Sequence, residues 1–360
     1  MPELSVTQSY LLFALLSLAA ADRNSMQPSK HFEELALIYR QKTFQSYTKS
    51  LQNITSDNYE TILLTGTFLI AIVPHPGSDA IDDDYLDWLY TLLKMSEGLR
   101  ILAGLRWSQG IEKLSIYPLI CRELRNLPPP PVAASLHTRA GPLGSTPIHP
   151  NPPSTYGLPG AMPGASTVFL PPPLMALLEN IMHPPDTGPF DLNGNILYPV
   201  FHVLSPMFLS LYYYRLNPDF NVRGFVFTSF LMPDFLALVK AREPRALVLL
   251  AWWFALLCLV PRGWWIGARV GVVRALARAI RKSRDVQVIK ALEGPERIVD
   301  VLMVAGIEKA AESVFEGWEG VRWDDGPRRA EEWEMGALVD LSDEIDFGGL
   351  DLDLDLDIAA

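Results

Sequence analysis

The apolar run ALVLLAWWFALLCLV, from Ala246 to Val260, decides the fold class of this 360-residue chain. Glu243-Pro244-Arg245 precedes it and Pro261-Arg262-Gly263 follows it. Its fifteen residues are too few to cross a membrane, for which about 20 are needed. A helix that is apolar on every side is buried in a large core. We therefore expect a buried helix here and a chain that is not an integral membrane protein.

A second helical pattern follows between Trp265 and Ile280. At 100° per residue its apolar side chains share one face: Trp265, Ile266, Val272, Val273, Leu276, Ala277 and Ile280. Arg274, Arg278 and Arg281 lie on the opposite face, which we interpret as solvated, although it could contact an anionic membrane or nucleic acid. Arg269 falls within the apolar face. Because an unpaired buried arginine is very costly, we expect it to pair with a carboxylate or to line a polar cavity.

Helical periodicity also dominates the rest of the sequence, and no stretch alternates as several β-strands would. We expect helices at 5–21, 29–53, 57–73, 83–104, 110–125, 173–183, 193–215, 231–242 and 284–317. Gly294-Pro295 should break the last of these, and Ser56-Asp57 should cap the third. Asp82-Asp83-Asp84 is expected at the N-terminal end of the fourth, where negative charge is favourable, and not as a cation site. The sequence thus predicts an all-α, multi-helix fold.

Composition divides the chain into four segments. Residues 128–173 contain 14 prolines and five glycines, which predicts polyproline II structure or disorder. This stretch is either a variable insertion or a docking site for a proline-binding module. We expect a first helical half over 1–127, the disordered Pro-rich insertion over 128–173, a second helical half over 174–317, and a loop with a disordered acidic tail over 318–360.

The net charge of −11 resides in the tail. Residues 331–360 contain eleven carboxylates and no Lys or Arg, which leaves 30 acidic and 30 basic residues in the body. A neutral body predicts no sequence-specific DNA binding by this chain alone. Acidic and hydrophobic residues alternate in the tail, as in disordered activation segments. We expect a transcriptional coactivator to be bound through Phe347, Leu350, Leu352, Leu354 and Leu356. The alternative is a solubilising tail.

Neither an enzyme nor a metal site is indicated. Cys121 and Cys258 lie in apolar surroundings, typical of free buried thiols in a reducing compartment, and the six histidines are scattered singly. The sequence has no glycine-rich phosphate loop and no nucleophile elbow, so we expect no catalytic activity and no cofactor. Leu11–Ala21 resembles a signal-peptide core but lacks the positive n-region, so a buried first helix is the preferred interpretation.

The residues from Met232 onward also resemble a known family. MPDFLAL at Met232–Leu238, REPRALVLLAWW at Arg242–Trp253, and Trp264-Trp265 with Arg274 are similar to the regulatory domain of fungal binuclear zinc-cluster transcription factors. The sterol-uptake-control-like subfamily is the most similar. YLLFALLSLAAAD from Tyr10 and HFEELALIYRQKTFQSY from His31 resemble its first helices. The resemblance therefore covers roughly 5–125 and 190–285, and it implies a nuclear regulator of transcription.

The six closely spaced cysteines of the zinc cluster are absent, since no cysteine precedes Cys121. Either a preceding segment is missing, or the chain works without its own DNA-binding module. The resemblance also implies that effectors, including sterols, act on this domain. The candidate pocket for such an apolar ligand is formed by Trp252, Trp253, Phe254, Trp264, Trp265 and Arg269.

Core packing is the alternative role of these aromatic residues. Family members often carry a His-Tyr pair where this chain has Trp252-Trp253, and the bulkier indoles could fill the space of a ligand. The alternative function is a helical small-molecule-binding protein with no transcriptional role.

Overall fold

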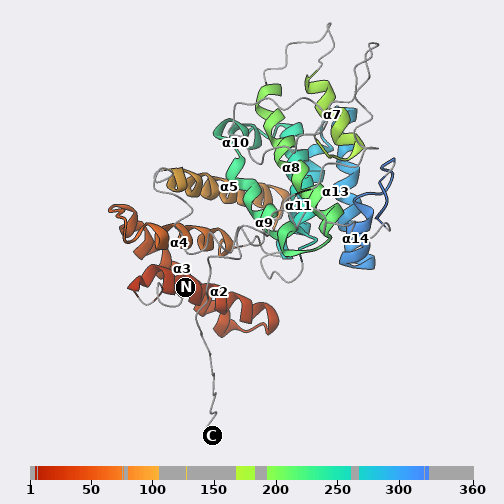
Figure 1. Ribbon diagram of the computed structural model, residues 1–360. Coiled ribbons are helices and arrows are strands. Elements are labelled where there is room, and N and C mark those ends of the chain that lie inside the picture. The colour runs from red at the N-terminus through yellow and green to blue at the C-terminus, as the bar shows by residue number, and fades with distance from the viewer. Residues whose placement is uncertain are drawn as a thin grey trace, which may run out of the picture.

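The computed structural model of the chain (Figure 1) describes residues 5, 7–74, 76, 80–104, 127, 168–182, 193–260, 267–319 and 321–323. Over these residues it has twelve α-helices, one 3₁₀ helix and no β-strand. The predicted all-α class is therefore confirmed. The helix expected at 110–125, nearly all of the Pro-rich insertion and the acidic tail lie outside the described residues.

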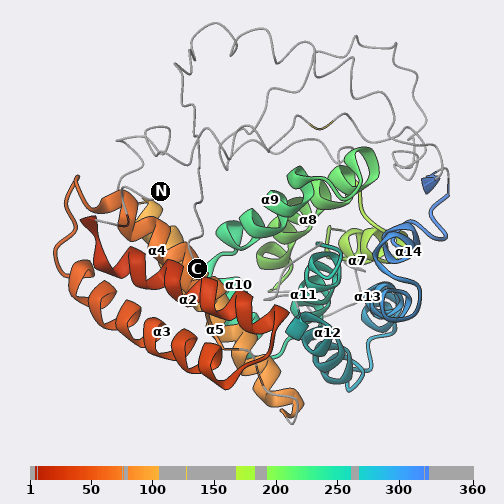
Figure 2. The same cartoon turned by 90° about the horizontal axis from the view of Figure 1, so that it is seen from below.

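The described helices form two layers of different size (Figure 2). Helix α11 (Pro244–Leu257) is the central element of the larger layer. Every side chain from Ala246 to Leu257 is buried, as predicted. Glu243 caps the helix, since its carboxylate accepts the amide of Ala246 at 2.7 Å. The helices packed against α11 are α8 (Gly194–Tyr214), α9 (Pro218–Val226), α10 (Pro233–Lys240), α12 (Gly267–Ile280) and α13 (Val286–Ala305).

The amphipathic pattern of α12 is confirmed. Val272, Leu276 and Ile280 are buried against the bundle, whereas Arg274 and Arg278 are exposed. Period-3.6 patterning therefore identified the buried face correctly.

The remaining elements of this layer are α7 (Pro172–Met182), the 3₁₀ helix η4 (Phe227–Phe230) and α14 (Ile307–Ser313). The C-terminal boundary of the Pro-rich insertion was predicted too late. Phe169 and Leu170 are buried in the main core, and Pro172 already begins α7. Proline suits the first turn of a helix, because its fixed φ is preorganised and its missing N–H has no partner there anyway.

Three N-terminal helices form a second layer with its own small core: α2 (Ser9–Met26), α3 (Lys30–Leu51) and α4 (Tyr59–Ala71). The hydroxyls of Tyr10 and Thr61 share a hydrogen bond of 2.7 Å that joins α2 to α4. Helix α5 (Asp82–Gly104) contacts α4 on one side and α10 and α12 on the other, so it connects the two layers. The predicted cap of α4 is wrong: Asn58 is the N-cap, and its side chain accepts the Thr55 amide at 2.8 Å.

One described helix, α8, is long and apolar enough to span a membrane by length and composition alone. The segments Pro218–Phe230 and Pro233–Lys240 meet the same criteria only together, as a pair bent by 90°. Within its most apolar window α8 is 67% buried inside the protein. Core helices of folded proteins meet these criteria too.

Candidate functional site

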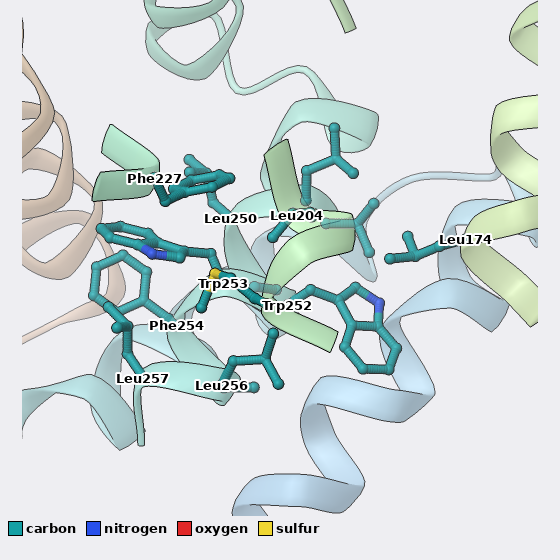
Figure 3. Close-up of a cluster of buried hydrophobic side chains, with 14 of the residues drawn as sticks. Leu174, Leu204, Phe227, Leu250, Trp252, Trp253, Phe254, Leu256 and Leu257 are labelled. Atoms are coloured by element: carbon teal, nitrogen blue, oxygen red, sulfur yellow. The ribbon is translucent and has the colours of Figure 1, made fainter. Parts of the chain in front are cut away.

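Trp252 extends from α11 toward α13 (Figure 3) and is buried. Its indole Nε1 donates a hydrogen bond of 2.8 Å to the carbonyl of Ala291. In a regular helix that carbonyl accepts the amide of the fourth residue on, but here this residue is Pro295, which has no N–H. Trp252 therefore supplies the donor that the proline removes.

Gly294 provides the space for this contact. A Cβ atom there would lie 2.2 Å from Cη2 and from Cζ2 of Trp252, much closer than real Cβ contacts allow. The expected helix break at Gly294-Pro295 is therefore wrong, and α13 continues to Ala305. The break occurs instead at Gly306, whose φ of 86° favours glycine.

Trp253 and Phe254 pack on the side of α11 that faces α9 and α5 (Figure 3). The indole Nε1 of Trp253 donates to the carbonyl of Gly224 at 2.9 Å. Its ring stacks on Phe227, with centroids 5.0 Å apart and planes at 24°. The ring of Phe254 meets the ring of Trp253 edge-on, with centroids 4.6 Å apart. Its centroid lies 6.3 Å from that of the Trp88 ring. Buried, hydrogen-bonded and stacked side chains of this kind favour the core role of Trp252, Trp253 and Phe254.

A small cavity of about 90 Å³ lies among α5, α10 and α11. It is lined by Leu86, Asp87, Leu89, Tyr90, Val239, Lys240, Arg242 and Leu247, and by none of the candidate pocket residues. Drug-sized ligands occupy pockets of roughly 300–1,000 Å³, so this cavity does not hold a sterol. Trp264 and Trp265 lie outside the described residues.

Arg269 is buried at the C-terminal end of α11, where its Nη1 donates to the carbonyl of Leu257. The last carbonyls of a helix have no partner within the helix, and the negative end of the helix dipole favours a cation there. The sequence predicts that Arg269 pairs with a carboxylate or lines a polar cavity. The acceptor is instead a backbone carbonyl. Burial lowers the pKa of Arg269 to about 9 and raises the pKa of the nearby Cys258 thiol to about 12. At neutral pH the guanidinium is therefore charged and the thiol is neutral.

A buried ion pair on α9 was missed by sequence analysis. Arg223 donates from Nε to Oδ2 of Asp219 at 2.7 Å and from Nη2 to Oδ1 at 3.1 Å. The hydroxyl of Ser210 on α8 donates to the same carboxylate. An acid followed four residues later by a base on a helix is the sequence pattern that could have revealed this pair.

The carboxylates at the start of α5 hold it to its neighbours. Arg278 on α12 donates from Nε to both oxygens of Asp82 at 2.8 Å, and Arg242 pairs with Asp83 at 2.8 Å. The guanidinium of Arg278 lowers the pKa of Asp82. The predicted N-terminal position of these acids is confirmed, since α5 begins at Asp82. Part of the α12 cationic face is thus paired within the protein, as is Arg281 with Glu296 at 2.6 Å.

Among the described side chains, no group of three or more His, Cys, Asp or Glu is placed to hold a metal ion. In comparisons with known proteins, no family model matched the sequence, and neither a curated protein nor a solved structure matched the chain.

Proposed function

We propose that this chain is a nuclear regulatory module of the fungal zinc-cluster transcription-factor type. The supporting observation is the position in the fold of the residues from Met232 onward that resemble this family. Pro233–Lys240, Pro244–Leu257 and Gly267–Ile280 form the helices α10, α11 and α12, and α11 is the centre of the larger helical layer. The segment that resembles the family is therefore the one on which the packing of this layer depends.

The second support is the separation of charge along the chain. All eleven carboxylates of residues 331–360 follow the last described helix, and the body before them is neutral. In an unfolded acidic segment, the acids steer the first encounter with a basic partner, and apolar side chains then anchor it as it folds. We propose that a transcriptional coactivator is bound in this way through Phe347 and the leucines from Leu350 to Leu356.

The packing of Trp252 and Trp253 bears on ligand sensing. The indole N–H groups of Trp252 and Trp253 are both bonded to backbone carbonyls, so a ligand at this position would have to displace structural contacts. The packing therefore favours an interaction module over the alternative of a small-molecule-binding protein.

The tail provides the test of the coactivator proposal. Residues 331–360, fused to an unrelated DNA-binding domain, should raise expression of a reporter gene. Replacing Phe347 and the four leucines by alanine should remove the effect, because the anchors are lost while the charge is unchanged. A variant with the aspartates from Asp351 to Asp357 changed to asparagine measures the separate contribution of charge. If the alanine variant activates as well as the native tail, the segment is a solubilising appendage only.

A further inference from the structure

One face of α3 points away from the protein and carries large apolar side chains. Figure 2 shows α3 on the outside of the layer that it forms with α2 and α4. Leu37, Ile38 and Phe44 on this outer face are 53%, 46% and 41% exposed, whereas Thr43 and Tyr47 on the inner face are buried. Single exposed apolar residues need no explanation, but a group on one helix face indicates an interaction surface.

The outer face is arranged symmetrically about Gln41. At 100° per residue, Leu37 and Phe44 lie about 20° apart around the helix, on either side of Gln41 along its axis. Ile38 and Gln45 form a second pair of this kind, on the opposite side of Gln41 around the helix. If a second α3 runs antiparallel with its Gln41 beside the first, Leu37 meets the partner's Phe44 and Ile38 meets the partner's Gln45. This arrangement places the apolar side chains of Leu37 and Phe44 from the two copies against one another on one flank of the face.

The charges of α3 are unevenly distributed, since both of its acids lie in the first turns, beside Lys30. Its acids, Glu33 and Glu34, lie in the first turns, and the later charges are all basic: Arg40, Lys42 and Lys49. Lys30 and Glu34 are 3.9 Å apart and well exposed, so their pairing is weak. An antiparallel neighbour brings Glu34 near the partner's Lys49 at both ends. A parallel neighbour would bring Glu34 near the partner's Glu34 and is therefore disfavoured.

We propose that the outer face of α3 is a self-association surface, through which two copies of this chain form a two-fold symmetric, antiparallel helix pair. Such a contact uses the same patch on both copies, so it closes at the dimer and does not build a filament. One helix pair buries less than the standard interface of about 1,600 Å². The dimer is therefore expected to dissociate at micromolar concentrations.

Sedimentation equilibrium of the full chain tests this proposal. Between about 1 and 100 µM, the average mass should rise from that of the 40.2 kDa chain toward twice that value. Leu37→Glu and Phe44→Glu should each hold the mass at that of one chain, and because both positions are exposed, the helical circular dichroism should not change. Met303→Glu, at an exposed apolar position on α13, is the matched control and should dimerise normally.

Charge reversal tests the antiparallel orientation. Glu34→Lys or Lys49→Glu alone should weaken the dimer, and the double variant should restore it, because both copies then carry the reversed pair. Failure of the double variant to restore association would overturn the antiparallel arrangement. A chain that stays monomeric at every concentration, or a dimer indifferent to Leu37→Glu, would overturn the proposal itself. So would a chain that dimerises only after residues 331–360 are removed, since the tail would then be the native occupant of this face.

Discussion

The contact between Trp252 and α13 can be tested with Gly294→Ala. The new methyl group would lie 2.2 Å from two ring atoms of Trp252, and neither the rigid indole nor the helix backbone can yield without loss. If the indole moves, its hydrogen bond to the carbonyl of Ala291 is lost. That carbonyl then has no donor from the helix, because residue 295 is proline.

The expected magnitude follows from three effects. Overpacking in a core costs about 1–3 kcal/mol. A buried carbonyl without a donor adds a cost of about 1–3 kcal/mol, whereas the higher helix propensity of alanine returns about 1 kcal/mol. We expect Gly294→Ala to lower the free energy of unfolding by about 3 kcal/mol.

Urea unfolding followed by circular dichroism measures this change against a matched control. Gly98 lies in α5, and a Cβ atom there would meet no other atom within 4 Å. Gly98→Ala should therefore stabilise the protein by up to about 1 kcal/mol. If the free energy of unfolding falls for Gly294→Ala and rises for Gly98→Ala, the effect of the indole contact is distinguished from that of helix propensity.

A double-mutant cycle identifies Trp252 as the cause. Trp252→Phe removes both ring atoms that the methyl group would strike, so Gly294→Ala should cost less in that background, with a coupling of at least about 1 kcal/mol. The reasoning fails if Gly294→Ala stabilises the protein as Gly98→Ala does. It also fails if the effects of the two substitutions simply add.

Three further predictions concern buried and surface charge and the candidate pocket. Arg223→Met should cost about 3–5 kcal/mol, because it leaves the buried Asp219 carboxylate without its cation. The double change with Asp219→Leu should recover most of that loss in the same unfolding assay. Asp82→Asn should lower stability by less than about 1 kcal/mol at pH 7, since its ion pair is solvent-screened. Because the folded-state pKa of Asp82 is lowered, this difference should be present above the unfolded pKa of about 3.9 and vanish as the pH falls through the folded value. A difference that persists in strong acid would refute the ion-pair explanation. Finally, Trp253→Ala should reduce the helical circular dichroism or the free energy of unfolding. If the variant stays folded and loses only the change in fluorescence on adding a sterol, the pocket is supported instead.

The sequence predicts those parts of the fold in which periodicity is strong. The unbroken apolar run from Ala246 to Val260 predicts a helix buried on every face, and α11 is one. The alternation along α12 likewise identifies its buried side. In both helices the burial of apolar area determines the packing, so composition and spacing are sufficient.

Prediction from the sequence fails where a side chain distant in the chain reverses a local conformational preference. Gly294-Pro295 alone predicts a helix end, but Trp252, about forty residues earlier, replaces the missing donor and fills the space above the glycine. The same limit applies to Arg269, whose partner is a helix-end carbonyl that no side-chain pattern reveals. Helix α9 was missed because its nine residues, PDFNVRGFV, are too few to show a helical period.

The central claim is that this chain regulates transcription through its acidic tail while its helical body binds no DNA itself. The most direct measurement tethers all 360 residues to an unrelated DNA-binding domain and compares reporter expression with and without residues 331–360. The account predicts activation by the whole chain and its loss when the tail is removed, with equal amounts of both proteins in the cell. An inert whole chain, or activation that survives removal of the tail, would contradict it.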